Sequence, residues 1–217
     1  MQKVNYQKWL DETIAGLGGR APSLLLHACC APCSSYVLEY LSEYFNITLF
    51  YYNPNISPEA EYRKRRNEAK RLIAEQPAKN PVGFAEGTYA PELFFETVKG
   101  HEADPERGER CTLCYRMRLE ETAKYARENG FEWFTTTLSL SPYKDARRLN
   151  AIGAEMEEKY GVKYLHSDFK KRGGYLRSIE LSRVYGLYRQ NTCGCIFSQK
   201  ATPVSPGEVD HPKPTQG

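Results

Sequence analysis

The sequence predicts an α/β fold with a mainly parallel sheet and helices on both of its faces. Two short apolar runs, at 23–28 and 47–52, are typical of buried strands, because each is bounded by residues that favour turns. Segments whose apolar residues recur at helical spacing alternate with these and later strand-like runs. Strands that alternate with helices form parallel sheets with right-handed crossovers.

The first strand, helix and strand are expected between residues 23 and 52. The loop CCAPC at 29–33 follows the first strand, and Ser34 and Ser35 are expected to cap the next helix. Apolar residues recur at helical spacing from 37 to 45, before the second strand begins. This unit places the cysteine-rich loop directly after a buried strand.

The next helix start has a clear signature. Ser57, Pro58 and Glu59 are typical of an N-cap, a proline in the first turn and an acidic first turn, and we expect this helix to run to about Glu75. Asn129-Gly130 is typical of a helix end. The remaining elements are expected in the order strand 82–85, helix 111–128, strand 131–138, helix 145–160, strand 162–166 and helix 175–187.

The chain is expected to form one domain. Its 217 residues, 41% of them hydrophobic, are enough to bury one substantial core. We expect an N-terminal helical segment at 1–20, a single domain at 21–200 and a disordered tail at 201–217. The tail contains four prolines and few residues that could be buried.

Composition leaves the binding partner open. The formal net charge of +3 is too small to indicate a nucleic-acid-binding protein, although it allows a local basic face. No run of about 18 apolar residues is present, so no membrane span is predicted. Charged residues interrupt the apolar residues of 1–20, unlike a signal peptide. We therefore expect a cytoplasmic monomer in a reducing compartment, where cysteines indicate metal binding or catalysis before disulfides.

Seven cysteines occur in three groups, each in a turn-rich segment or at a helix start. Free cysteine is often simply a small buried residue, but clusters of three, two and two favour a metal site over that reading. Sulfur-rich sites suit zinc or iron–sulfur clusters equally, so the spacing does not choose between them. A cubane cluster takes four cysteines, which would leave three for a second metal. The groups are Cys29, Cys30 and Cys33; Cys111 and Cys114; and Cys193 and Cys195.

The sequence resembles the QueH-type epoxyqueuosine reductases in several motifs that occur in one order. These are LLLHACCAPCSSYVLEYL, YYNPNISPEAEYRKRRNEAKRL, RCTLCYRMRLEETA, FTTTLSLSPYKD, HSDFKKRGGY and SIELSRVYGLYRQNTCGCIFS, which span about 24–198. The resemblance implies a Rossmann-like fold related to the nucleotide-binding PP-loop (HUP-type) proteins, with a cysteine-rich metal site at the carboxyl edge of the sheet. The loop CCAPCSS stands where those relatives hold phosphate, which argues against ATP use.

The resemblance also implies an activity and its cofactors. The implied reaction converts the epoxide of epoxyqueuosine in tRNA to the alkene of queuosine. The implied cofactors are a 4Fe-4S cluster and an adjacent mononuclear iron that polarises the epoxide oxygen as a Lewis acid. The partners would be the tRNA and an electron donor of unspecified identity. In this family the position of Cys33 is not always a cysteine, so its role and the division of the seven thiols between the two metals stay open.

Further residues are candidates on the same basis. A proton donor for the departing oxygen is sought among Tyr143, His166 and Asp168, which follow predicted strands. His27 is expected to be a hydrogen-bonded core histidine, or to contact a metal-binding thiolate without itself binding the metal. Candidates for holding the substrate or the RNA phosphates are Asn53, Asn55, Tyr62, Arg65, Arg66, Lys170, Lys171 and Arg172.

Two other functions remain open at this stage. One is a cluster-dependent tRNA sulfur transferase on the same fold, which would be expected to retain an ATP loop. The other is a non-catalytic RNA-binding module that zinc holds together. Colour separates the zinc module from the other two functions, because an iron–sulfur protein is brown and a zinc protein is colourless.

Overall fold

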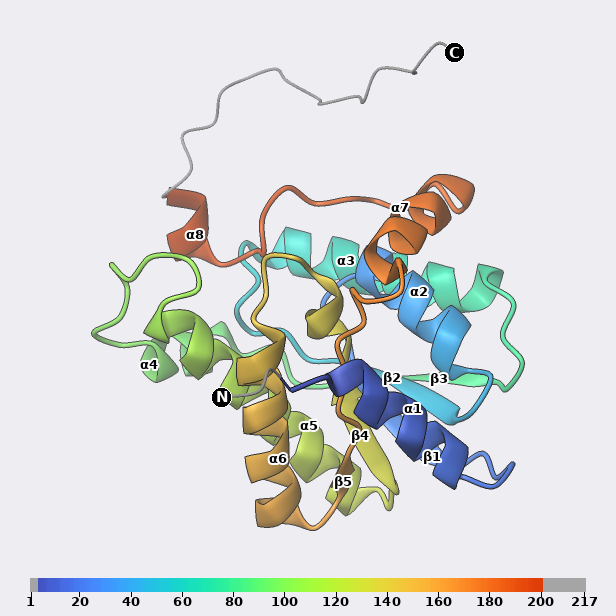
Figure 1. Cartoon of the computed structure of the whole chain (residues 1–217). Helices are drawn as coiled ribbons and strands as arrows, with labels where there is room; N and C mark the ends of the chain where they lie inside the picture. Colours follow the sequence, from blue (N-terminus) through green and yellow to red (C-terminus); the bar gives the residue numbers. More distant parts are fainter. Residues whose placement is uncertain (1–3, 201–217) are drawn as a thin grey trace, which may run out of the picture.

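A computed structural model describes residues 4–200 of the chain (Figure 1). The predicted tail at 201–217 lies outside the described residues. The elements are α1 (Tyr6–Gly16), β1 (Ser23–His27), α2 (Ala31–Leu41), β2 (Asn46–Tyr51), α3 (Glu59–Glu75), β3 (Val82–Glu86), α4 (Pro91–Thr97), α5 (Glu109–Glu128), β4 (Trp133–Thr136), the 3₁₀ helix η1 (Thr137–Leu140), α6 (Ala146–Tyr160), β5 (Lys163–Tyr164), α7 (Gly174–Val184) and α8 (Ile196–Lys200).

The sheet has five parallel strands in the order β3-β2-β1-β4-β5. The central strand β1 pairs with β2 on one side and β4 on the other, so that Leu25 lies opposite both Thr48 and Phe134. The strand order changes direction between β1 and β4. In open α/β sheets, ligands bind in the crevice beyond the carboxyl ends of the strands at such a switch point.

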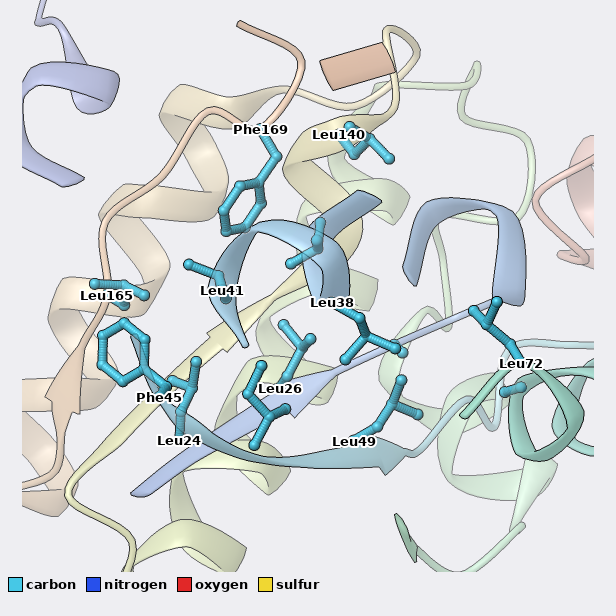
Figure 2. Close-up of a cluster of buried hydrophobic side chains, with 14 of the residues drawn as sticks. Leu24, Leu26, Leu38, Leu41, Phe45, Leu49, Leu72, Leu140, Leu165 and Phe169 are labelled. Carbon is cyan, nitrogen blue, oxygen red and sulfur yellow. The ribbon is translucent and has the colours of Figure 1, made fainter. Parts of the chain in front are cut away.

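Helices cover both faces of the sheet, which confirms the predicted fold class. Leu24 and Leu26 of β1 point to one face, where they pack with residues of α1, α2 and α3; Figure 2 shows this cluster. Leu25 of the same strand points to the opposite face and packs with residues of α5 and α6. The alternation along β1 follows from the two-residue period of a strand.

Several local predictions are corrected. Ser34 and Ser35 do not cap α2, because the helix already begins at Ala31 with Cys30 as its N-cap. Their hydroxyls instead donate to the carbonyls of Cys30 and Pro32 inside the first turns. The strand expected at 131–138 ends at Thr136 and continues as η1.

Two helices were not predicted, and the helix after Ser57 begins one residue later than expected. The short helices α4 and α8 carry too few turns to show a periodic pattern. Pro58 is the N-cap of α3, so the helix starts at Glu59. Within residues 4–200, no helix is long and apolar enough to cross a membrane.

Gly153 of α6 lies against the side chain of Tyr164 in β5, with almost no space between them. This close packing gives a first testable prediction. A Cβ atom here would lie 2.3 Å from two ring carbons of the buried Tyr164. We expect Gly153→Ala to lower the free energy of unfolding by about 1–3 kcal/mol through overpacking, despite the better helix propensity of alanine. Urea unfolding measures this change, and a stabilised variant would contradict the packing.

Candidate metal centre

A cavity of about 230 Å³ lies among the cysteine-bearing segments. Six of the seven cysteines line it, all but Cys30. The first group follows β1, the second begins α5, and the third follows α7. The fold therefore brings the three cysteine segments, far apart in sequence, to one cavity beside the switch point of the sheet.

The first group joins β1 to α2. The sulfur atoms of Cys29, Cys30 and Cys33 all lie within 4.8 Å of one another, and the Cys29 and Cys30 sulfurs are 3.7 Å apart. Hydrogen bonds from the thiols of Cys29 and Cys33 lower the pKa of Cys30. The bond to Cys30 raises the pKa of Cys29 to about 11. The trio thus favours one thiolate, at the N-terminus of α2, where the helix dipole stabilises negative charge.

The second group lies in the first turns of α5. Cys111 and Cys114 are both buried, and their spacing places the two sulfurs on the same face of the helix. The backbone N–H of Arg107 donates to the Cys111 sulfur at 3.3 Å. Burial raises the pKa of the Cys114 thiol. Two of the three groups therefore lie at helix N-termini. The partial positive charge there stabilises the thiolate form that binds a metal.

The third group is held in place by the backbone around Gly194. The Ser57 N–H donates to the Gly194 carbonyl at 2.9 Å, and the Arg65 guanidinium donates to the carbonyls of Thr192 and Cys193 at 3.3 Å each. Gly194 has a φ of +91°, and a Cβ there would lie 3.0 Å from the Ile56 side chain. The space that Gly194 leaves in place of a side chain therefore faces Ile56 and Arg65.

Four cations that sequence reasoning missed line the cavity, namely Arg110, Arg118, Lys144 and Arg189. Arg118 is 3% exposed and lies four residues after Cys114 on α5, so the helical spacing alone indicates a shared face. The side chain of Lys144 is only 10% exposed. Burial by itself would lower the pKa of Lys144, but the nearby Cys193 thiolate raises it above the usual value. A hydrogen bond from Cys195 and the charge of Lys144 lower the pKa of Cys193 in turn.

Four buried polar atoms on the cavity wall have no hydrogen-bond partner among the described residues. They are the Asn55 Oδ1, Arg110 Nε, Tyr115 hydroxyl and Gln190 Oε1 atoms. Buried polar groups are nearly always satisfied in folded proteins, so a concentration of unsatisfied ones in a single cavity indicates a ligand site. The set offers both donors and acceptors.

The three expected proton donors do not share this cavity. Tyr143 lines it and is 62% exposed, beneath the guanidinium of Arg107. His166 packs against Tyr6 and hydrogen-bonds to Asn150 instead. Asp168 lines a separate groove and pairs with Lys170 at 2.7 Å. Of the three, only Tyr143 therefore lies beside the cysteines, although each follows a predicted strand.

The predicted substrate residues in the loop after β2 and on helix α3 fall into different environments. Asn55 lines the cavity, whereas Asn53 is buried behind it and donates to the Ala28 carbonyl at 2.8 Å. Tyr62 is buried and donates to Glu86, which also pairs with Arg66 at 3.2 Å. Arg65 lines the cavity but uses its donors on Glu61 and the loop carbonyls. The remaining three, Lys170, Lys171 and Arg172, lie in the groove that contains Asp168.

His27 is a hydrogen-bonded core histidine, as expected. Its Nδ1 lies 2.9 Å from the Thr136 hydroxyl and its Nε2 lies 3.0 Å from the Tyr52 carbonyl oxygen. Burial lowers its pKa to about 4. The ring is therefore neutral at physiological pH and ties the ends of β1, β2 and β4 together behind the cysteine loop.

Comparison with known proteins identifies close relatives along most of the chain. A family model described as epoxyqueuosine reductase QueH matches residues 24–201, which include all three cysteine groups. The epoxyqueuosine reductase QueH of Streptococcus pyogenes serotype M1 is 41% identical over 209 residues, covering 92% of this chain and 80% of the relative. The one from Staphylococcus epidermidis is 43% identical over 203 residues, covering 91% and 85%. The one from Thermotoga maritima is 41% identical over 180 residues, covering 81% and 90%.

Proposed function

The chain belongs to the epoxyqueuosine reductase QueH family, and on that premise we propose that it reduces the epoxide of epoxyqueuosine in tRNA to the alkene of queuosine. The reaction takes up two electrons and two protons and releases the epoxide oxygen as water. The observation that carries the proposal is the convergence of six cysteines from three segments on one cavity. Because the reaction consumes two electrons, an external electron donor is a required partner.

The donor set fits an iron–sulfur cofactor. We propose that the seven cysteines hold a 4Fe-4S cluster and an adjacent iron, since a cubane cluster uses four thiolates and three remain. When bound, the cluster would supply electrons one at a time, and the adjacent iron would supply a Lewis acid. The helix N-termini of α2 and α5, together with Arg118 and Lys144, provide the positive charge that offsets several thiolates in a buried site.

The chain's other cavity residues act on the substrate in this proposal. Asn55 and Gln190 present carbonyl oxygens that accept hydrogen bonds from the hydroxyls or base of the modified nucleoside. Tyr143 lies at the exposed side of the cavity, where its hydroxyl can donate a proton to the departing oxygen. Lys170, Lys171 and Arg172 contact RNA phosphates.

The test is anaerobic reconstitution with iron and sulfide, metal quantitation, and incubation of the reduced protein with RNA that contains epoxyqueuosine. We expect a brown protein that binds iron and converts the RNA to a product lighter by one oxygen atom, measured by mass spectrometry. A colourless zinc protein without conversion would favour the RNA-binding module. Incorporation of sulfur into the RNA with ATP consumption would favour the sulfur transferase.

A further inference from the structure

A second, larger groove lies beside the cysteine cavity. Its volume is about 1140 Å³, and its walls are the start of α1, the start of α6 and the turn that follows β5. Lys144 lines both the groove and the cavity, so the two spaces adjoin at the loop before α6. In Figure 1, α1 and α6 lie close together at the end of α6 where this loop enters.

The groove is lined by more positive than negative side chains. Six cations face it, from three segments of the chain, against three carboxylates. The cations are Lys8, Lys144, Arg147, Lys170, Lys171 and Arg172, and the carboxylates are Asp11, Asp145 and Asp168.

All three carboxylates are already engaged. Asp11 pairs with Arg172 at 2.6 Å, and Asp168 pairs with Lys170 at 2.7 Å. Asp145 caps α6 by accepting from two backbone N–H groups at its start. Within residues 4–200, the side chains of Arg147 and Lys171 make no ion pair or hydrogen bond. These two cations are therefore available to an anionic ligand.

The other basic surface of the chain differs in this respect. Helix α3 also carries six positive residues, but each of them is engaged within the protein. Lys64 lies 3.4 Å above the ring of Tyr188. The ion pairs of this helix are Arg63–Glu59, Arg65–Glu61, Arg66–Glu86, Lys70–Glu86, Arg71–Glu68 and Arg71–Glu75. Because the cations of α3 already have partners, this helix presents a solvated face with little charge to spare. The groove, with two cations that lack partners in the described part of the chain, is the better candidate for binding an anion.

Aromatic rings accompany the cations of the groove. Tyr6 forms part of its wall and stacks on His166, with ring centroids 6.2 Å apart. Trp9, one turn later on α1, contacts both rings and is 45% exposed. A cationic groove with an aromatic ring in its wall and an exposed one, Trp9, beside it suits single-stranded nucleic acid, in which the backbone follows the charges and bases stack on rings.

We propose that the groove between α1 and the 168–172 turn holds the ribose-phosphate backbone of the tRNA loop next to the modified nucleotide. Arg147 and Lys171 contact its phosphates, and the strand turns into the cysteine cavity at Lys144. This inference rests on the proposed function and adds to it the route of the RNA and the contribution of α1.

The test compares two charge-reversal variants of the reconstituted full chain. Arg147→Glu/Lys171→Glu changes the groove, and Lys124→Glu/Arg127→Glu makes the same change on exposed residues of α5 outside it. Binding is measured by fluorescence anisotropy with an anticodon stem-loop that carries an unmodified guanosine, over a series of salt concentrations. We expect the groove variant to bind at least roughly tenfold more weakly, with the salt slope reduced by about two. The α5 variant should bind within about twofold of wild type.

Turnover of epoxyqueuosine-containing RNA separates this inference from the function. We expect the groove variant to raise KM with little change in kcat, at unchanged iron content. A groove variant that binds RNA and turns over as wild type does would overturn the groove while the function stands. Equal weakening in both variants would also overturn it, because the effect would then follow net charge alone. A wild-type chain that binds the RNA without converting it would overturn the proposed function. The anisotropy comparison of the two variants would then still decide whether the groove binds RNA.

Discussion

Cys195→Ala is expected to lose most of the bound iron and more than about 100-fold of the reductase activity together. Changes to residues that only orient metal ligands already cost about 10–100-fold, so loss of a ligand should cost more. Cys195 is 6% exposed, lines the cavity and hydrogen-bonds to Cys193. Iron per chain and turnover, measured on the same reconstituted sample, check this expectation.

The control for this variant is Val98→Ala. Val98 is fully buried in the same small apolar cluster as Cys195 but does not line the cavity. We expect it to lose about 1–2 kcal/mol of stability and to keep its iron. Normal iron content and activity in Cys195→Ala would remove the third cysteine group from the site, and equal iron loss in both variants would show that packing, not the thiol, was responsible.

The sequence predicted the convergence of the cysteines better than it predicted their surroundings. Cys29 directly follows a central strand, and such loops gather at the carboxyl edge of a parallel sheet. The same rule failed for His166 because β5 is a two-residue edge strand, away from the switch point between β1 and β4. Its end therefore faces α1 and not the cysteine cavity.

Other features of the site depend on contacts that leave no local trace in the sequence. The spacing of Arg118 from Cys114 was a usable signal, since four residues along a helix share a face. Lys144 had no such signal, because its burial depends on loops that are distant in sequence. The charge run of α3 was ambiguous until the pairing of each residue was known. A sequence shows where charges are, whereas their availability depends on which partners the fold places beside them.

Arg65→Met is expected to lower the free energy of unfolding by about 3 kcal/mol and to weaken iron binding. The guanidinium is 2% exposed, pairs with Glu61 at 2.7 Å and donates to the carbonyls of the 192–193 loop. Removing one partner of a buried pair costs about 3–5 kcal/mol, and the 19% exposure of Glu61 places the expected cost at the lower end. Because the loop carries Cys193, it should also hold metal less well.

Arg63→Met on the same helix is the matched control. Arg63 pairs with Glu59 at 2.7 Å, but the two side chains are 63% and 55% exposed, and exposed pairs contribute about 0–1 kcal/mol. Urea unfolding of both variants, with Arg65→Met repeated in a Glu61→Gln background, tests the account. The cost should fall in that background, since no carboxylate is then left without its partner. Equal small losses for Arg63→Met and Arg65→Met, with a raised KM only in the latter, would instead make Arg65 a substrate contact, because the loop would then hold its position without the guanidinium.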